Sequence, residues 1–590
     1  MNYRHYLFGV FFAFLFCGTA QASDFVAKIF APYPLETESA NPFRQLQQQD
    51  RVHYQRIFAL QRRAQWSRAD SLIKKINNPI LMGHVRFQRL MHPRGYRSTF
   101  SELANWLVKY ADLPEADRVY RLAQNRRPAE TRRKLKRPVP KVRLSQPSVQ
   151  PAATNAKPRD DISWESQKIL NQVEEAIKDE RISVTLRRLR QHPWRSQLSD
   201  REFVQALGKI AKGYAVYGHD IKAIAAAQEA LKLNTDYPSQ AYWWAGLAAW
   251  RMGNYKEAAK FFIILGSNPD AKKDMAAAAN FWGWRAAMRL GQIHKAHSAL
   301  KQASKDRYSF YGQLAGHALS IPDQFDWNIR TDVPAAKELV QRHPVLQRIL
   351  ALAEVNEHGL AQAEFAQIRF DTHQDNLLDV MLIADQAGLA DAVISLGNKE
   401  RKKSGIWHDS SRYPLPRWGF MKSYSIDRAL LFGLIRQESL FEIQAKSNAS
   451  ARGLMQIMPD TARLMQKRLN APLGSYYNPA INLTLGQEYL QYLLRLPEIN
   501  YNLIYALAGY NAGPGRLRDW RKKPELQNDP LLFIETIPMR ETRHYIETVL
   551  GNLWIYRKRL GQPTPSLEMI LESQWPTYQR FDTKPTSKNP

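Results

Sequence analysis

Cysteine is almost missing from this chain, and acidic residues and long hydrophobic runs are also scarce. The single cysteine among 590 residues is Cys17. It lies inside an N-terminal apolar segment and follows Phe16, whereas a lipoprotein processing site requires a small residue there. A chain without further cysteines has no disulfide framework and no thiolate nucleophile or thiolate metal site. Its stability must therefore come from packing.

The apolar run at the N-terminus is too short to cross a membrane. Residues 7–16 are apolar, Arg4 and His5 precede them, and the small residues Ala20 and Ala22 stand just before Ser23. A spanning helix needs about 20 apolar residues. The arrangement predicts a cleaved signal peptide over residues 1–22, rather than a transmembrane anchor, and therefore export.

Acidic residues are outnumbered by basic ones. The chain has 84 Lys and Arg against 55 Asp and Glu, a formal net charge of +29 and a pI near 9.9. Such an excess predicts attraction to a polyanion. Nucleic acid is one candidate, but export argues against it, and a basic surface can also serve solubility alone.

The length predicts several domains, since an ordinary domain has roughly 100–200 residues. Residues 23–125 show helical patterning. Residues 126–162 are basic and rich in proline, a composition that cannot bury a core. We interpret them as a linker, either a solvated hinge or a tether, with a nucleic-acid-binding arm as the alternative. Residues 576–590 are predicted to be a disordered tail.

Residues 163–415 contain a helical quasi-repeat. It is marked by glycines at similar spacing: Gly218, Gly253 and Gly291. The spacings of 35 and 38 residues are close to the tetratricopeptide period of about 34, in which paired helices stack into a solenoid. Trp244 and Trp282 occupy matching positions, so we expect them in the helix core rather than on a sugar-binding surface.

Glu438 is the strongest candidate for catalysis. The sequence predicts a helix from Ser425, as N-cap, with Asp427 in its first turn, to about Glu438. Apolar residues precede Glu438 by three, four and seven positions, which places its carboxylate on the apolar face, near the negative end of the helix dipole. Both effects raise a carboxyl pKa, as a general acid requires. A solvated glutamate at a frayed helix end is the alternative.

Three further segments carry distinctive patterns. Residues 447–459 combine glycine with a short extended run and predict a tight hairpin. Residues 506–515 read as the end of a helix followed by a glycine-rich turn. Residues 533–538 lead into a helix with a clear apolar face.

Together these segments resemble the catalytic domain of the soluble lytic murein transglycosylases, a lysozyme-like domain akin to goose-type lysozyme. The matching blocks are RQES at 436–439, GLMQIMP at 453–459, YNAG at 510–513 and ETRHY at 541–545. Their order and spacing together make the resemblance specific. It implies a mainly α chain, in which a superhelical, tetratricopeptide-like α-helical solenoid is followed by a lysozyme-like α+β domain over residues 416–575. In this family the helical region curls into a ring or a U. The insertion after Asn125 is not part of the family's pattern, so the resemblance does not predict whether a ring closes in this chain.

The resemblance also implies site residues. Glu438 becomes the single catalytic acid/base, and the saccharide cleft is lined by Ser447, Gln456, Met458, Thr461, Tyr510, Asn511, Glu535 and Tyr545. Structural alternatives remain for several of them: Met458 as core filler, Ser447 as a turn former and Tyr545 as a helix-packing residue. Ser450 stands where the family commonly has glycine, which predicts a local change in the hairpin.

The implied reaction cleaves the β-1,4 bond between N-acetylmuramic acid and N-acetylglucosamine in periplasmic peptidoglycan, leaving 1,6-anhydromuramyl ends without hydrolysis. Glycan strands are the expected partner, and nucleic acid is not expected; proteins of cell-wall synthesis or division are further candidates that the sequence does not identify. No cofactor and no metal is expected, because His294 and His297 lack a third ligand nearby. The rival interpretations are a goose-type hydrolytic muramidase and a glycan-binding solenoid scaffold.

Overall fold

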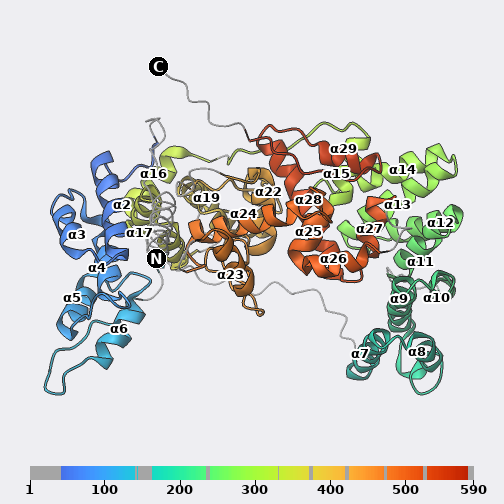
Figure 1. Cartoon of the computed structure of the whole chain (residues 1–590), viewed down its shortest axis with the longest axis horizontal. Helices are drawn as coiled ribbons and strands as arrows, with labels where there is room; N and C mark the ends of the chain where they lie inside the picture. Colours follow the sequence, from blue (N-terminus) through green and yellow to red (C-terminus); the bar gives the residue numbers. More distant parts are fainter. Residues whose placement is uncertain are drawn as a thin grey trace, which may run out of the picture. The chain divides into compact units, whose positions relative to one another are not determined.

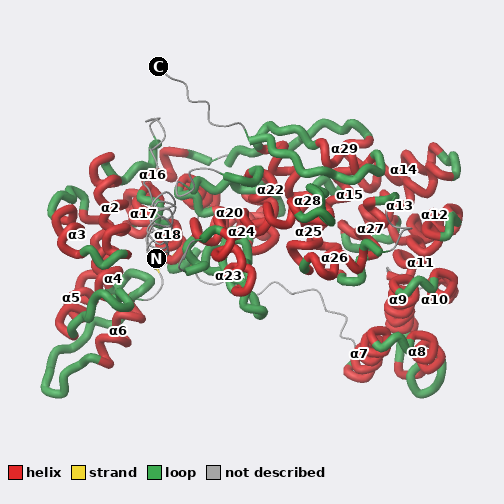
Figure 2. The backbone as a smooth tube through the Cα atoms, viewed as in Figure 1, coloured by secondary structure: helices red, strands yellow, loops and turns green. Residues whose placement is uncertain are grey.

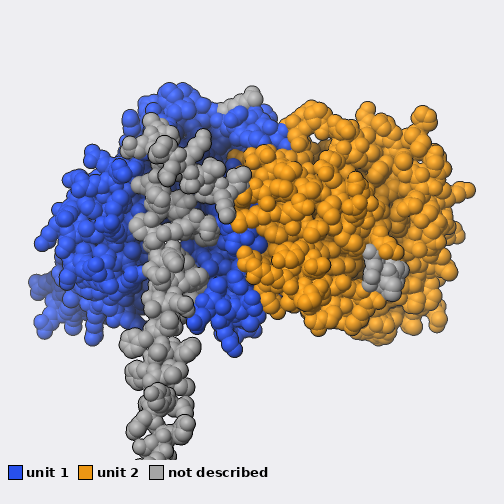
Figure 3. Space-filling view, turned by 45° about the horizontal axis from the view of Figure 1, so that its top comes forward, with its two compact units in different colours: residues 1–151, 325–489 blue, residues 152–324, 490–590 orange. Residues whose placement is uncertain are grey.

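Helices dominate the computed structural model of this protein (Figure 2). It describes residues 41–139, 142–143, 163–233, 240–329, 331–370, 376–418, 424–470, 475–522 and 528–582. The chain forms two compact units, each assembled from two separate stretches (Figure 3): residues 1–151 with 325–489, and residues 152–324 with 490–590. The predicted signal peptide lies outside the described residues. The linear domain boundaries given above stay a prediction.

The first unit contains the N-terminal helices and the beginning of the predicted catalytic domain (Figure 1). Its N-terminal elements are α2 (Gln48–Arg62), α3 (Trp66–Ile73), the 3-10 helix η1 (Pro79–Leu81), α4 (Met82–Leu90), α5 (Phe100–Tyr110), α6 (Ala116–Asn125) and β1 (Val142–Arg143). Its later elements are α16 (Val333–Arg342), α17 (Pro344–Glu354), α18 (His358–Phe365), β2 (Ile368–Arg369), α19 (Leu377–Gln386), α20 (Ala390–Ser404), α21 (Asp409–Arg412), α22 (Arg428–Ser439) and α23 (Pro459–Arg468). The division between the units falls within α24 (Pro479–Arg495).

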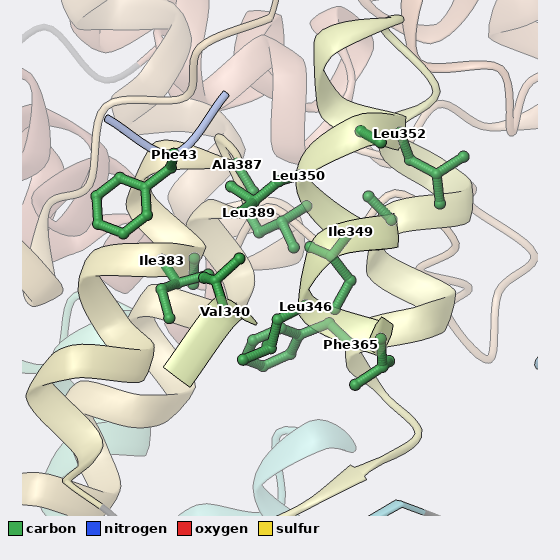
Figure 4. Close-up of a cluster of buried hydrophobic side chains, with 14 of the residues drawn as sticks. Phe43, Val340, Leu346, Ile349, Leu350, Leu352, Phe365, Ile383, Ala387 and Leu389 are labelled. Carbon is green, nitrogen blue, oxygen red and sulfur yellow. The ribbon is translucent and has the colours of Figure 1, made fainter. Parts of the chain in front are cut away.

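One hydrophobic core joins the two stretches of the first unit. Phe43, from the segment before α2, packs among side chains of α16 to α19, including Val340, Leu346 and Ile383 (Figure 4). All four side chains are buried. Since burial of apolar surface is the main stabilising contribution to folding, the N-terminal helices are held by residues about 300 positions later in the sequence.

The start of the predicted linker is exposed, as expected of a solvated segment, but it is fastened to the protein rather than free. The amide of Val139 donates to the carbonyl of Ala111 at 2.8 Å, and Leu135 packs against the core of α5 and α6. Strand β1 then pairs in parallel with β2, Val142 opposite Ile368. Composition alone did not show these backbone bonds. Residues 144–162 lie outside the described part of the chain.

The second unit contains the predicted helix pairs and the end of the catalytic domain. Its first stretch holds α7 (Trp164–Lys178), α8 (Ile182–Leu189), the 3-10 helix η2 (Arg195–Gln197), α9 (Asp200–Val216), α10 (Asp220–Lys232), α11 (Gln240–Arg251), α12 (Tyr255–Gly266), α13 (Lys273–Arg289), α14 (Ile293–Ala303) and α15 (Phe310–Ala318). Its second stretch holds α25 (Leu503–Ala512), α26 (Pro514–Trp520), α27 (Pro530–Thr536), α28 (Arg540–Arg559) and α29 (Pro565–Leu571).

The quasi-repeat corresponds to three helix pairs. Gly218, Gly253 and Gly291 connect α9 to α10, α11 to α12 and α13 to α14, and their φ angles of 79°, 72° and 66° lie in the left-handed region. Glycine is the residue that adopts this region at the least cost. Trp244 and Trp282 are buried, which confirms their assignment to the core. The mainly α fold with a helical solenoid is therefore confirmed.

The predicted disordered tail begins too early. The amide of Leu503 donates to the carbonyl of Pro576 at 2.8 Å, and the amide of Tyr578 donates to the carbonyl of Tyr501 at 2.8 Å. Residues 576–578 are therefore held by backbone hydrogen bonds, and residues 583–590 lie outside the described residues. Among the helices that the structure describes, none has the length and apolar character that crossing a bilayer requires.

Candidate active site

Glu438 lies in the last turn of α22, as predicted, but the helix begins differently. Asp427 is the N-cap, and its carboxylate accepts the amide of Ala429 at 3.0 Å. The prediction that Ser425 caps the helix is wrong. Ser425 lies before the cap, and its amide donates to the side-chain oxygen of Gln487 at 2.9 Å. Leu434 and Ile435 are fully buried, whereas Glu438 is half-buried. The carboxylate therefore stands where the apolar face of the helix meets a more open region.

The end of α22 is pinned to the turn that follows. Leu440 and Phe441 have φ angles of 48° and 67°, so the helix stops abruptly after Ser439. The hydroxyl of Ser439 donates to the carbonyl of Leu454 at 2.8 Å. This bond ties the residue next to Glu438 to residues 453–456, here called the GLMQ segment or GLMQ turn. It fixes the position of Glu438 relative to that segment.

The predicted hairpin is present as two isolated antiparallel bridges, Lys446 with Arg452 and Arg452 with Ile457. These bridges are the β structure of the described part of the predicted catalytic domain in this unit, and tight turns connect them. Gln456 has a φ of 44°, and its side-chain amide donates to the carbonyls of Gly453 at 2.8 Å and Ala445 at 3.2 Å. Gln456 thus holds the turn through its side chain.

Ser447 has the structural role that the sequence offered as its alternative. Its hydroxyl accepts the amide of Ala451 at 3.0 Å, and its own amide donates to the carbonyl of Ala451 at 3.1 Å. These bonds close the turn that carries Ser450. A turn-forming serine can still contact a ligand, because the side chain is half-buried.

Ser450→Gly is expected to stabilise the protein by up to ~1 kcal/mol, because a non-glycine residue in the left-handed region is strained by about that amount. Ser450 has a φ of 69°, the conformation that the family's usual glycine adopts readily. Urea denaturation of the variant measures the gain. Ser67→Gly, in the regular helix α3, is the control and should lose stability. A variant less stable than the parent would contradict the prediction.

Asn482 is a positioning residue that the sequence did not single out. Its side chain is fully buried, accepts the amide of Met455 at 2.8 Å and donates to the carbonyls of Arg452 at 2.8 Å and Tyr476 at 3.0 Å. A β-carbon added to Gly453 would clash with the side-chain amide of Asn482. The available signal was an asparagine between the apolar residues Ile481 and Leu483 in α24.

Asn482→Ala is expected to destabilise the protein by about 2–3 kcal/mol, since it leaves buried backbone groups without partners. Catalytic turnover should fall as well, because the GLMQ segment loses its support. Thermal unfolding and peptidoglycan digestion measure the two effects. Asn171→Ala, on the exposed face of α7, is the control and should change neither quantity. Full activity in the Asn482 variant would refute a positioning role.

Met458 and Thr461 lie at the start of α23. Met458 occupies the N-cap position and is 41% exposed, which excludes its alternative role as core filler. Thr461 is half-buried in the first turn of the helix. An exposed methionine beside a polar turn provides an adaptable apolar contact for a ligand.

Tyr510, Asn511 and Tyr545 come together in the second unit. The rings of Tyr510 and Tyr545 stack with their centroids 6.5 Å apart and an interplanar angle of 9°. The hydroxyl of Thr542 donates to the side-chain oxygen of Asn511 at 2.6 Å. Tyr545 is buried, so it packs between helices, whereas Tyr510 is half-buried.

Glu535 is buried in α27, and its described contacts are internal. The hydroxyl of Tyr311 donates to its carboxylate, and the indole of Trp282 donates to that hydroxyl at 3.1 Å. Burial raises the pKa of Glu535, although Tyr311 and Arg543 oppose the shift. Burial and the neighbouring Glu535 raise the pKa of Glu547 still further. These surroundings are those of a structural carboxyl pair, in which Glu535 and Glu547 are joined by a hydrogen bond.

The carboxyl pair should make stability depend on pH. Both pKa values lie above the ordinary range in the folded chain, so the unfolded chain releases these protons first and stability falls as pH rises above about 4.3. Glu547→Gln, which is always neutral, should show a shallower decline of Tm between pH ~5 and ~8. Glu541→Gln, on the exposed face of α28, should keep the parental slope. Parallel curves for the parent and Glu547→Gln would contradict this.

The predicted site residues thus form two groups, one in each unit. Glu438, Ser447, Gln456, Met458 and Thr461 belong to the first unit, and Tyr510, Asn511, Glu535 and Tyr545 belong to the second. The described residues contain no cluster of three or more His, Cys, Asp and Glu side chains suited to a metal ion. His294 and His297 are exposed on α14.

Residues 420–532 match the family described as the Transglycosylase SLT domain. The soluble lytic murein transglycosylase of Escherichia coli K12 is 30% identical over 298 residues, covering 48% of this chain and 44% of that protein. Its counterpart in Salmonella typhimurium LT2 is 28% identical over 307 residues, covering 50% and 45%. The chain thus matches less than half the length of these relatives.

The crystal structure of the 70 kDa soluble lytic transglycosylase of Escherichia coli aligns with a TM-score of 0.47 and 18% identity, over 90% of this chain and 99% of that chain. A similarity this low supports no conclusion. The sequence match is the informative result: residues 420–532 are similar to the transglycosylase SLT domain. The motifs predicted this similarity, which the chain shares with the soluble lytic murein transglycosylases over about half of its length.

Proposed function

We propose that this protein is a periplasmic lytic transglycosylase of peptidoglycan. The observation that carries the proposal is the placement of Glu438. Its carboxyl group is half-buried at the end of an apolar helix, and Ser439 ties that end to the GLMQ turn. A general acid has to hold a proton that it can donate to the leaving oxygen, and we assign this role to Glu438.

The proposed reaction uses this one carboxyl group twice. Glu438 donates its proton to the oxygen of the β-1,4 bond between N-acetylmuramic acid and N-acetylglucosamine, and the bond from C1 of the muramyl residue to that oxygen breaks. The resulting carboxylate accepts the proton of the muramyl C6 hydroxyl, whose oxygen then bonds to C1. A 1,6-anhydro ring closes, and Glu438 is protonated again. Glycosidases that use water usually need a pair of carboxylates.

The remaining site residues are proposed as glycan contacts. Met458 offers an exposed apolar side chain, and Gln456 and Ser447 shape the turn beside it. Thr461 lies in the following helix turn. Tyr510 and Asn511 are half-buried at the end of α25 and suit contacts with a sugar ring. Glu535 and Tyr545 support their surroundings through buried contacts.

Mass analysis of fragments released from purified peptidoglycan tests the proposal. The expected products carry 1,6-anhydromuramyl ends. Fragments with reducing ends would identify a hydrolytic muramidase of goose-lysozyme type instead. Binding of peptidoglycan without any released fragment would identify a glycan-binding scaffold. Periplasmic location is tested separately, by fractionation of cells and by the mass of the mature N-terminus.

A further inference from the structure

The positive charge of the chain is concentrated in one stretch that the proposed reaction does not use. Residues 86–137, here called the basic arm, contain fourteen Lys and Arg against five Asp and Glu. They therefore carry a net charge of +9 out of +29 for the whole chain. The arm comprises the end of α4, α5, α6 and the segment after α6, all within the first unit (Figure 1).

The cations of the segment after α6 bond to neutral acceptors. Arg126 donates to the hydroxyl of Ser98 at 2.6 Å, and Arg133 donates to the side-chain oxygen of Asn105 at 2.7 Å. Lys136 donates to the carbonyl of Val108 at 3.1 Å. Such bonds hold the side chains in place without neutralising them, so their charge stays available to an anion.

Three arginines of the arm line one cavity of about 550 Å³. Its walls are the loop between α4 and α5 and one face of α6, with these charged, aromatic and apolar side chains: His92, Arg94, Tyr96, Arg97, Leu122 and Arg126. No carboxylate of the described residues pairs with Arg94, Arg97 or Arg126. We call these three residues and their cavity the arginine pocket.

The walls of the arginine pocket are fixed by contacts of their own. The indole of Trp66 donates to the carbonyl of Gly95 at 3.0 Å, and the amide of Gly95 donates to Nδ1 of His92 at 2.8 Å. The nearby carboxylate of Glu102 is occupied, because the hydroxyl of Tyr96 and the amide of Thr99 donate to it. These contacts hold the backbone that carries Arg94 and Arg97, whose side chains are exposed, and a backbone held in this way loses little entropy when a ligand binds.

We propose that the arginine pocket binds carboxylate groups on the peptide side chains of peptidoglycan. The inference rests on the proposed function, which makes this polymer the ligand at hand. Guanidinium groups bind carboxylates in a two-pronged geometry, and a cavity of this size accepts a peptide end rather than a broad surface. The pocket would hold the polymer through its peptides, using residues other than those that act on the glycan.

Binding to insoluble peptidoglycan tests the proposal. The full chain carries Glu438→Gln, so that the polymer is not consumed, and is compared with the same chain carrying Arg94→Gln and Arg97→Gln. The control carries Arg56→Gln and Arg187→Gln, two exposed arginines without pairing in the structure, and loses the same charge. Each protein is sedimented with intact peptidoglycan and with glycan strands from which an amidase has removed the peptides.

The pocket variant should bind intact peptidoglycan roughly 5- to 10-fold more weakly than its parent, since two charge-assisted contacts are lost. The control should bind like the parent, and all three should bind peptide-free glycan equally. Equal binding of the pocket variant and its parent to intact peptidoglycan would overturn the proposal. So would a loss that persists on peptide-free glycan. Product analysis with Glu438 intact tests the proposed reaction independently.

Discussion

Replacing Glu438 with glutamine is expected to lower the rate of peptidoglycan cleavage by roughly 10²- to 10⁴-fold, the usual contribution of a general acid or base. Glutamine keeps the size of the side chain but neither donates a proton to the leaving oxygen nor accepts one from the C6 hydroxyl. Because the side chain is only half-buried, folding should be unaffected. Release of soluble fragments and thermal unfolding measure the two quantities.

Glu442→Gln is the matched control for this substitution. Glu442 follows α22 by three residues and is exposed, so the variant carries the same substitution close to the same helix end. It should cleave peptidoglycan at the parental rate. A Glu438→Gln protein that retains most of its activity would assign the chemistry to another residue and would remove the basis of the proposed reaction.

Local patterns in the sequence predicted the helices and the turn glycines well. Gly253 illustrates the reason: a left-handed φ between two helices favours glycine, and this requirement is visible in the residue itself. The last turn of α22 could also be predicted, because the helical spacing of apolar residues continues up to Glu438 and then stops. Asp427 and Ser425 are both good capping residues two positions apart, and only their tertiary contacts decided which one caps the helix.

Contacts between distant segments could not be predicted in this way. The core that holds Phe43 against α16 to α19 depends on residues about 300 positions apart. The segment after α6 looked like a free linker, because its backbone hydrogen bond with Ala111, the residue after α5, leaves no trace in composition. Asn482 supports the GLMQ turn through three bonds that likewise require the folded chain.

The placement of Glu535 shows the same limit within the site. Its sequence context resembled a saccharide-contacting position, and its motif neighbours were found as expected. The surroundings of its carboxylate come from Tyr311 in α15 and Arg543 in α28, from segments more than 200 residues apart. Motif spacing therefore indicates which residues gather, but burial decides whether such a residue can reach a ligand.

Glu364→Ala is expected to destabilise the protein by about 3–5 kcal/mol, because removing one partner of a buried ionic cluster leaves other charges uncompensated. Glu364 is fully buried. Its carboxylate lies 2.9 Å from Nε2 of His84 and accepts Nε and Nη2 of Arg348 at 2.6 and 3.0 Å. These bonds join α18 to α4 and α17, and urea denaturation measures their loss.

Glu338→Ala is the control, since Glu338 forms an exposed ion pair with Arg342 on α16, and such pairs contribute at most about 1 kcal/mol.

The buried cluster also makes the predicted loss of stability depend on pH. Burial tends to raise the pKa of Glu364, but the bonds from His84 and Arg348 outweigh it, and the pKa is lowered. The unfolded chain therefore binds this proton first, at about pH 4.3. The stability difference between parent and Glu364→Ala should hold above that value and shrink as the solution is acidified further. A small difference that does not change with pH would mean that the cluster contributes no more than a surface pair.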